Sequence, residues 1–433
     1  MKKNGFTLVE ITVCVVLLVT IFLIVVPKVN TMINNKKKNA YNSLISTVKD
    51  AAQAYVYLNV NIVDDAIESQ GYYEVSIRTL QENELLENKL ENPLTGKNIP
   101  STSIVKIIKN NEEYIYKFSL DYQYLLEHII DLYSSEETRI SNGLKKDNTP
   151  DQNIRYYGSD PNNYVSFNNE LWRIIGVFGN NVKLVRKDSL GSLSWDSSES
   201  SINGGVGINQ WGESKDADGN EYAGADLQVY LNKMYYGGTS VTCYGGTKNS
   251  TTTCPTNTLD NTAKALIDNH TWNTGAPNHS TLYNSTTQSY DTVEFYKAER
   301  GTVNGKICSS GTYCNDTVTR TTEWTGYIGL PYVTDYAYAS SENDCNTKID
   351  QSSTYKCKNN NWMHRSTSTW YMSPYAIPYN ATSVWYVYGD GSSGLSLAAD
   401  ALSAFPTIYL KSNVLIDSGK GTSSDPYILK AGL

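Results

Sequence analysis

The sequence predicts an α+β fold, in which a long N-terminal membrane helix and a small antiparallel sheet precede a mainly β, loop-rich C-terminal domain. Three observations support this prediction. Residues 6–26 form an apolar run that contains one charged side chain, Glu10. An amphipathic helical pattern and a hairpin pattern come after this run. Beyond residue 150 the composition changes, because all eight tryptophans and six of the seven cysteines lie there. A chain of 433 residues is long enough for two or three compact units.

The apolar run has the length of a membrane span. As a helix it would extend about 30 Å, enough to cross the hydrocarbon core of a bilayer. It ends at Val26-Pro27-Lys28 without a small-residue cleavage site, so an ordinary secretory signal is not expected. A carboxylate inside hydrocarbon costs a few kcal/mol, so Glu10 requires a partner. A plain single-pass anchor does not explain this glutamate.

The residues around Glu10 suggest that partner. The opening MKKNGFTLVE resembles the leader of type IV prepilins and pseudopilins, in which a short basic peptide ends in glycine and is succeeded by Phe-Thr-Leu-x-Glu. The resemblance implies that a peptidase cleaves after Gly5 and that the new N-terminal residue, Phe6, is methylated. It also implies that Glu10 pairs with the N-terminal amine of a neighbouring subunit during assembly. Two opposite charges that are each costly in a low-dielectric setting are tolerable together.

The resemblance also implies a location. It predicts a single-pass protein of the cell membrane, with its C-terminal part outside, that joins a surface filament after assembly. The lysines argue the other way, because Lys28 and the run 36–38 lie after the apolar segment, and a simple positive-inside count would keep the long C-terminal part in the cytoplasm. Long domains translocate with little regard to charge, so the leader motif outweighs this count.

The segment 28–120 predicts a pilin-like head. Residues 77–90 indicate a short helix, and residues 104–108 and 114–118 indicate a β-hairpin. A long helix that precedes a small antiparallel sheet is similar to the head of minor pilins. Apolar residues at three- and four-residue spacing predict the long helix of this head: Tyr41, Leu44, Ile45, Val48, Ala52, Tyr55 and Val56.

The remaining chain predicts a separate domain. Its opening contains strand patterns at 164–167, 171–177 and 182–186, a helix is indicated at 226–232, and two strands close the chain. The stretches NYVSFNNELWRIIG and YLKSNV resemble an uncharacterised extracellular domain found behind pilin-type leaders, whose plan suggests a C-type-lectin-like architecture. The expected divisions are a leader peptide 1–5, a transmembrane and assembly helix 6–27, the head 28–120, a helix and linker 121–155, and the C-terminal domain 156–433.

Six cysteines beyond the apolar run predict disulfides in an oxidising compartment. Six cysteines allow 15 connectivities, so the sequence does not determine the pairing. The simplest arrangement joins sequence neighbours in three local bridges: Cys243–Cys254, Cys308–Cys314 and Cys345–Cys357.

Two further features allow more than one interpretation. Asp216, Asp218 and Asn220 alternate around a glycine as calcium ligands do, but the bidentate glutamate of an EF-hand would fall on Leu227. A solvated acidic turn also explains them, so no cofactor is expected and calcium is the only candidate. The tryptophans at 324, 362, 370 and 385 suit either a sugar- or protein-binding platform or a packed core.

Taken together, these features predict a minor pilin or pilin-like subunit that assembles through its N-terminal helix and displays an adhesion or binding domain. The alternative is a pseudopilin tip subunit of a type II secretion or DNA-uptake machine. No catalytic motif is present in the sequence, and no enzyme is expected. The expected partners are a prepilin peptidase, other pilin subunits, the membrane and an unidentified glycan or protein ligand. Nucleic acid is not expected as the main ligand, because the net charge is -8 and phosphate contacts require a basic surface.

Overall fold

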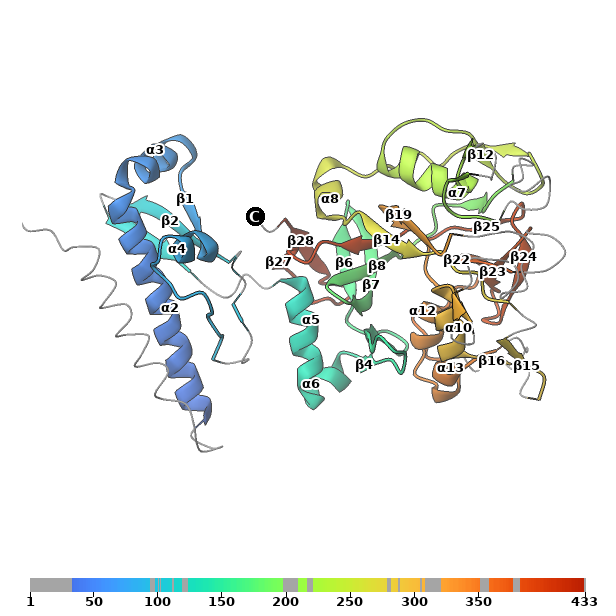
Figure 1. Cartoon of the computed structure of the whole chain (residues 1–433), viewed down its shortest axis with the longest axis horizontal. Coiled ribbons are helices and arrows are strands. Elements are labelled where there is room, and N and C mark those ends of the chain that lie inside the picture. Colours follow the sequence, from blue (N-terminus) through green and yellow to red (C-terminus); the bar gives the residue numbers. More distant parts are fainter. Residues whose placement is uncertain are drawn as a thin grey trace, which may run out of the picture. The chain divides into compact units, whose positions relative to one another are not determined.

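The computed structural model divides the chain into two compact units, which we call unit 1 (Met1–Gln123 with Gly432–Leu433) and unit 2 (Tyr124–Ala431) (Figure 1). Each unit contains its own hydrophobic core. The structure describes residues 33–93, 98–99, 101, 103–110, 113–118, 124–197, 209–215, 221–278, 282–286, 289–303, 306–307, 321–350, 358–376 and 382–431.

Unit 1 combines one long helix with a three-stranded antiparallel sheet in the order β1-β2-β3. Its described helices are α2 (Ile33–Leu58), α3 (Val60–Gln70) and α4 (Ile77–Glu82), and its described strands are β1 (Tyr73–Ser76), β2 (Ile104–Asn110) and β3 (Glu113–Lys117). The residues of α2 that recur at helical spacing face the core: Leu44, Val48, Ala52 and Val56 are each at most 6% exposed. The amphipathic pattern therefore packs the helix into the core formed with the sheet.

Capping residues mark where α3 ends and where α4 begins in unit 1. α3 stops at Gly71, which adopts a left-handed conformation with φ of 84° and donates its N–H to the carbonyl of Ile67. α4 begins after Ser76, whose Oγ accepts a hydrogen bond from the N–H of Thr79 at 3.0 Å. The helix expected over 77–90 is shorter than its pattern suggested, since α4 ends at Glu82.

The largest sheet of unit 2 has nine strands, seven of them in the order β20-β26-β8-β7-β6-β28-β27, with β5 pairing β7 and β4 pairing β5. The strands are β4 (Leu144–Lys146), β5 (Ile154–Tyr156), β6 (Tyr164–Phe167), β7 (Glu170–Phe178), β8 (Asn181–Arg186), β20 (Ile328–Gly329), β26 (Thr407–Leu410), β27 (Leu415–Ser418) and β28 (Tyr427–Lys430). Asn168 and Asn169 join β6 to β7 with φ of 57° and 56°, as a tight hairpin turn requires. The final strand β28 lies parallel to β6.

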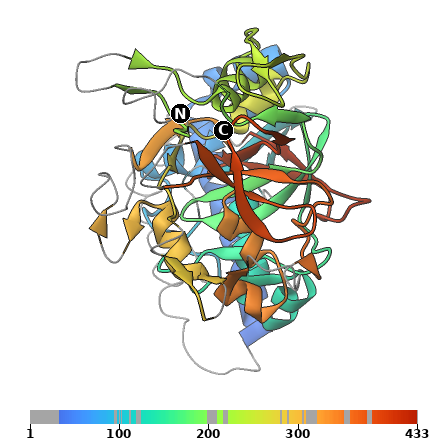
Figure 2. The ribbon, with the colours of Figure 1, turned by 90° about the vertical axis from the view of Figure 1, so that its right-hand side faces the viewer.

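A five-stranded sheet in the order β24-β23-β22-β25-β9 forms the second part of unit 2 (Figure 2). Its strands are β9 (Ser192–Ser194), β22 (Thr369–Pro374), β23 (Ser383–Val387), β24 (Ser393–Leu397) and β25 (Ala401–Ser403). Within the described ranges, the helices of unit 2 are α5 (Leu125–Ser134), α6 (Glu136–Ser141), α7 (Asp226–Val229), the π-helix η1 (Tyr230–Tyr236), α8 (Asn261–Leu266), α10 (Thr292–Glu299), α12 (Val333–Tyr338) and α13 (Asn343–Thr347).

Short ribbons complete unit 2. They pair β10 (Ser214–Lys215) with β11 (Glu221–Tyr222), β12 (Cys243–Tyr244) with β13 (Thr251–Thr252), β14 (His270–Asn273) with β19 (Glu323–Gly326), and β17 (Thr302–Val303) with β18 (Lys306–Ile307). A three-stranded ribbon joins β15 (Tyr283–Asn284), β16 (Ser289–Asp291) and β21 (Lys348–Asp350). The aromatic core lies among these elements, and six tryptophans are fully buried in it: Trp172, Trp195, Trp211, Trp272, Trp370 and Trp385.

The predicted fold class needs correction. Across the ranges that the structure describes, no helix is both long enough and apolar enough to cross a bilayer. The longest described helix, α2, is an amphipathic helix of unit 1 with Lys36–Lys38 near its start. The apolar residues 6–27, on which the prediction of a membrane helix rested, lie outside the described residues. The described fold is a mixture of many small sheets and short helices, and the membrane helix, the single-pass placement and the location derived from them are not retained.

The segment 121–155, expected as a helix and linker between two domains, contributes structure to unit 2. It contains α5, α6, β4 and the first residues of β5. The N–H of Leu125 donates to the carbonyl of Val414 at 2.9 Å. The division between the units therefore lies before Tyr124, about 30 residues ahead of the composition change near residue 150, because the helix and the polar loop after it pack into the same core.

Candidate functional site

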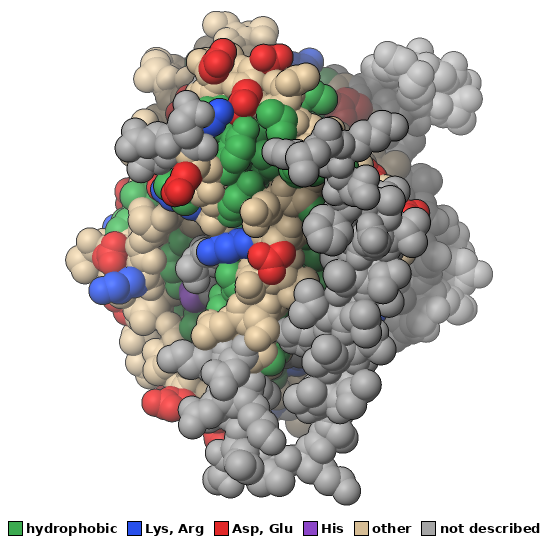
Figure 3. Space-filling view, turned by 90° about the vertical axis from the view of Figure 1, so that its left-hand side faces the viewer, with side chains coloured by type: hydrophobic (Ala, Val, Ile, Leu, Met, Phe, Trp, Pro, Cys, Tyr) green, Lys and Arg blue, Asp and Glu red, His purple; other side chains and the backbone are tan. Residues whose placement is uncertain are grey.

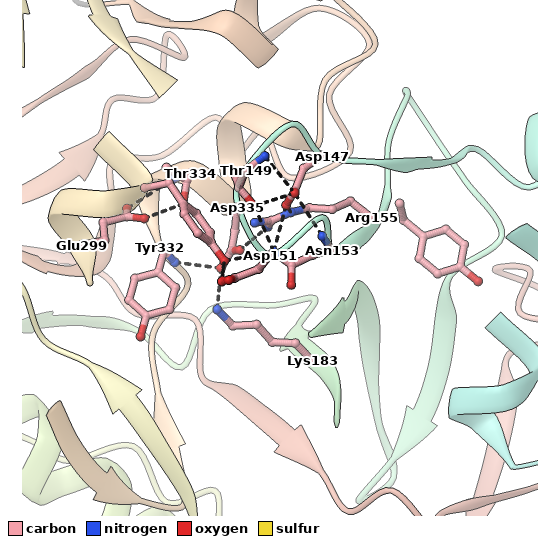
Figure 4. Close-up of polar contacts among 12 residues, drawn as sticks. Asp147, Thr149, Asp151, Asn153, Arg155, Lys183, Glu299, Tyr332, Thr334 and Asp335 are labelled. Carbon is pink, nitrogen blue, oxygen red and sulfur yellow. Dashed lines mark hydrogen bonds and ion pairs between the residues drawn. The ribbon is translucent and has the colours of Figure 1, made fainter. Parts of the chain in front are cut away.

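A group of charged side chains joined by ion pairs is buried in unit 2 (Figure 4). We call Asp147, Arg155, Lys183, Glu299 and Asp335 the buried ionic cluster. Arg155 Nε lies 2.7 Å from Asp147 Oδ2, and Arg155 Nη1 lies 2.6 Å from Asp335 Oδ1. Lys183 Nζ lies 2.6 Å from Asp335 Oδ2. These four side chains are at most 1% exposed, so positive and negative charges alternate through a region closed to water.

Asp147 organises the loop that leads into β5. Its carboxylate accepts hydrogen bonds from Thr149 Oγ1 at 2.6 Å and from the N–H and Nδ2 of Asn153, each at 3.0 Å. Burial alone would raise the pKa of Asp147, but the Arg155 guanidinium and these hydrogen bonds hold it below the usual value. The Asp147 carboxylate therefore stays ionised. Its hydrogen bonds fix the conformation of the loop before β5, for which the sequence alone indicates only a polar segment.

Asp335 is the shared acceptor of the cluster. It lies in the first turn of α12, where the N–H of Tyr332 donates to its Oδ2 at 2.9 Å. Burial would raise the pKa of Asp335, but Lys183 and Arg155 lower it. One carboxylate from a helix thus holds a cation from β5 and a cation from β8.

Lys183 projects from β8 into an aromatic setting. Its Nζ lies 4.1 Å from the ring centre of Tyr332 and 5.3 Å from that of Tyr409. Burial lowers the pKa of Lys183 to about 8, although Asp335 opposes the shift. The aromatic faces and the carboxylate together replace the water that an ammonium group would otherwise keep.

Glu299, at the end of α10, is fully buried beside this network. It accepts hydrogen bonds from Thr334 Oγ1, from the Thr334 N–H at 3.3 Å and from Ser373 Oγ at 3.4 Å. Burial raises the pKa of Glu299 to about 7, with Arg300 acting against the shift. Glu299 is therefore the carboxylate of the cluster whose protonation changes near neutral pH.

The geometry of the cluster favours a structural role over a catalytic one. Perturbed pKa values often mark active sites, but a substrate reaches these groups only if the fold opens. Among the described residues of the cluster, Arg155 Nη2 is the one nitrogen without a hydrogen-bond partner. Within the described ranges, no three His, Cys, Asp or Glu side chains gather as metal binding would require. The ion pairs and hydrogen bonds of the cluster connect the loop before β5 with the large sheet and with helices α10 and α12.

The residues predicted to direct processing and assembly, Gly5, Phe6 and Glu10, lie outside the described residues. The calcium candidates Asp216, Asp218 and Asn220 also lie outside them. Among the cysteines, the structure contains a disulfide between Cys243 and Cys254, one of the three expected local pairs. Cys345 is also disulfide-bonded. The other three candidates, Cys308, Cys314 and Cys357, lie outside the described residues.

The tryptophans considered as a binding platform mostly belong to the core. Trp362 is 3% exposed, and Trp370 and Trp385 are not exposed at all. Trp324 is partly exposed, and its Nε1 donates to Glu213 Oε2 at 3.1 Å. The platform formed by four tryptophans is therefore not assembled.

Sequence reasoning missed the buried ionic cluster. Its members lie up to 188 residues apart (147 to 335), and each has an ordinary local context. The available signal was a basic residue inside an otherwise apolar strand pattern, Lys183 in VKLV and Arg155 in IRY. A charge at a position buried on a strand requires a partner, but the pattern does not say which carboxylate provides it.

Comparison with known proteins gives no further assignment. Neither the family models, nor the curated proteins, nor the solved structures contain a match to this chain.

Proposed function

We propose that the chain is a subunit of a type IV pilin-like filament, in which the N-terminal segment and unit 1 make the contacts of assembly and unit 2 serves as a binding module. The prepilin-type opening of the sequence, with Gly5, Phe6 and Glu10 at the offsets of that leader, supports this proposal. Cleavage after Gly5 would create the N-terminal amine at Phe6 that pairs with Glu10 of a neighbouring subunit.

The observation that carries the proposal is an exposed apolar stretch on unit 1, which we call the 57–62 stretch. Four of its six side chains are large, apolar and exposed: Tyr57 (74%), Leu58 (51%), Val60 (39%) and Ile62 (58%). It covers the end of α2 and the start of α3. Apolar side chains reach the surface on the side of unit 1 drawn in Figure 3. Single exposed apolar residues are ordinary, but four large ones within six residues of the chain favour a protein contact.

The division into two units supports separate roles for them. Unit 2 buries its own aromatic core and its own ionic cluster, so it can hold its shape whatever contacts unit 1 makes. A unit of this kind, attached to a small assembly unit, suits recognition of a ligand more than repetition along a filament shaft.

The test measures incorporation into filaments. Tyr57→Ser combined with Ile62→Ser should reduce the amount of the protein in sheared filaments several-fold, because the substitutions remove apolar area from the proposed contact. Leu397→Ser is the matched control, since Leu397 is 55% exposed on unit 2. Glu10→Val should be cleaved normally and yet incorporate poorly. Wild-type incorporation of both variants would reject the proposal.

A further inference from the structure

We propose that strand β3 of unit 1 pairs with β3 of a second copy of this chain, in an antiparallel arrangement with two-fold symmetry about Ile115. The two three-stranded sheets then join edge to edge, in the order β1-β2-β3-β3-β2-β1. The contact uses residues other than those of the 57–62 stretch.

Strand β3 lies at an edge of its sheet. It pairs with β2 on one side. Among the described residues, no strand pairs with its other side, and no loop makes a hydrogen bond with its backbone. An edge of this kind presents N–H and C=O groups to an extended chain that lies beside it.

The sequence of β3 is complementary to itself. It consists of Glu113, Tyr114, Ile115, Tyr116 and Lys117, with a central isoleucine, a tyrosine on each side of it and opposite charges at the two ends. In an antiparallel pair centred on Ile115, Glu113 lies opposite Lys117 of the second copy, and Lys117 lies opposite its Glu113. Side chains directly opposite each other have Cβ atoms about 5 Å apart, so both ends of the contact form ion pairs.

The side chains that make this contact are exposed. Glu113, Ile115 and Lys117 alternate with the tyrosines and share one face of the sheet, and Ile115 is 38% exposed. The tyrosines belong to the other face, where Tyr114 Oη donates to Oδ1 of Asp64 in α3 at 2.7 Å. Neither charged end of β3 has an ion-pair partner in the part of the chain that the structure describes.

The neighbouring strand gives Lys117 a further need for a carboxylate. Lys117 lies directly opposite Lys106 of β2, and like charges in this position destabilise a sheet. Lys106 has its own counter-charge, because its Nζ lies 4.0 Å from Glu74 Oε1 of β1. Glu113 of the second copy supplies the corresponding carboxylate to Lys117.

The opposite edge of the sheet lacks this complementarity. Strand β1 has the sequence Tyr-Glu-Val-Ser, with one acidic residue and no basic one. Two copies of β1 paired in the same way would have no opposite charges to join. Charge therefore selects β3 as the edge that meets its own copy.

A two-fold contact closes after two copies, because each copy uses the same surface. It is therefore distinct from a filament contact, which repeats from subunit to subunit, and it does not depend on the proposed filament function. The contact is small, since β3 has five residues. Its backbone hydrogen bonds and the two Ile115 side chains hold the copies together, while the charges determine register and partner.

The experiment measures the molar mass of the purified full chain by sedimentation equilibrium, from about 5 to about 500 μM, a range that covers the weak affinities of small interfaces. The wild type should change from monomer to dimer as its concentration rises. Glu113→Lys and Lys117→Glu should each weaken dimerisation at least about tenfold, because each places like charges opposite each other at both ends of the contact. Glu87→Lys, an equal change of charge at an exposed position outside the sheet, should dimerise as the wild type does.

An equimolar mixture of the Glu113→Lys and Lys117→Glu chains should form dimers again, because every charged pair across the contact then has opposite signs. The chain that carries both substitutions should dimerise alone for the same reason. This recovery separates a lost contact from a lost fold, since misfolded chains would not regain it.

The chain with Tyr57→Ser and Ile62→Ser should dimerise as the wild type does, which separates this contact from that of the filament. The inference is overturned if the wild type stays monomeric over the whole range, or if Glu113→Lys dimerises as the wild type does. It is also overturned if the mixture of the two single variants contains no more dimer than each variant alone.

Discussion

Asp335 is the side chain on which the buried ionic cluster depends. It accepts from Arg155, from Lys183 and from the backbone of Tyr332. A buried ion pair is weak evidence of net stabilisation, because desolvation offsets much of the attraction. Removing one partner is different, because the charges that remain stay buried without compensation.

Asp335→Asn should therefore destabilise unit 2 by about 3–5 kcal/mol, since it preserves volume and leaves Lys183 and one edge of Arg155 unpaired. Chemical denaturation monitored by tryptophan fluorescence measures this loss. Asp417→Asn is the matched control: Asp417 pairs with Lys430 at 2.8 Å but is 49% exposed, so its loss should cost about 1 kcal/mol or less. Adding Lys183→Met to Asp335→Asn should recover part of the loss. If Asp335→Asn and Asp417→Asn lowered the free energy of unfolding equally, the buried cluster would not depend on Asp335.

Glu299 predicts a pH dependence of stability. Its pKa is about 7 in the folded chain against 4.5 for an ordinary glutamate, so the folded state binds the proton more tightly. Its contribution to stability is complete below pH 4.5 and declines as pH rises towards 7, by about 3 kcal/mol in all for a shift from 4.5 to about 7. Glu299→Gln should remove this part of the dependence.

The measurement for Glu299 compares the unfolding free energies of the variant and the wild type in steps from about pH 5 to about pH 8, the range over which linkage predicts the change. The variant should gain stability relative to the wild type as pH rises, and the difference should level off above about pH 7. Glu323→Gln, at an exposed position of β19, is the control and should show no such trend. A difference that does not change with pH would show that Glu299 is ionised in both states.

At the scale of elements, β7 shows how a single glycine permits a strand pairing. The register of β7 against β8 shifts between Ile174 and Gly176. A Cβ at Gly176 would lie 2.1 Å from the carbonyl oxygen of Ile154 and 3.1 Å from Cα of Arg155. The absence of a side chain therefore lets β5 approach β7, and β5 carries the arginine of the buried ionic cluster.

Gly176→Ala should force β5 away from β7 and destabilise unit 2 by about 1–3 kcal/mol or more, as overpacking against backbone usually does. Denaturation monitored by tryptophan fluorescence checks the loss. Ser192→Ala, at an exposed position of β9, is the control and should change stability by about 0.5 kcal/mol at most. A tolerated alanine at 176 would mean that β5 does not approach β7 this closely in solution.

At the scale of the whole molecule, the two units have separate cores and different aromatic contents. The core of unit 1 contains aliphatic residues with Tyr55 and Phe118, and all tryptophans belong to unit 2. Stability is defined separately for each cooperative unit. We expect two thermal transitions in calorimetry, of which one coincides with the tryptophan signal.

Asp335→Asn should shift only the transition that the tryptophans report, whereas Val48→Ala, a cavity-forming change in the core of unit 1, should shift only the other. A single transition that both substitutions shift equally would show that the units unfold as one.

Local patterns predicted several described elements well. The hairpin expected at 104–108 and 114–118 is present as β2 and β3, and Asn168-Asn169 forms the expected turn. These elements depend on alternation of apolar residues and on turn residues that tolerate positive φ, both of which act within a few residues. The helix over 77–90 was predicted too long, because α4 ends at Glu82 and the chain turns at Glu84, where φ is 60°.

The sequence by itself determined several local elements of the described chain, among them the β2–β3 hairpin and the Asn168-Asn169 turn. It also raised the hypothesis of a filament subunit through the residues around Glu10. Only the tertiary structure decided where the units divide, that seven of the eight tryptophans are buried, and that Asp335 joins Arg155 and Lys183. The physical reason is range: periodicity and turn chemistry act between neighbours in sequence, whereas a buried charge is satisfied by whichever carboxylate the fold brings to it, here 152 and 180 residues away.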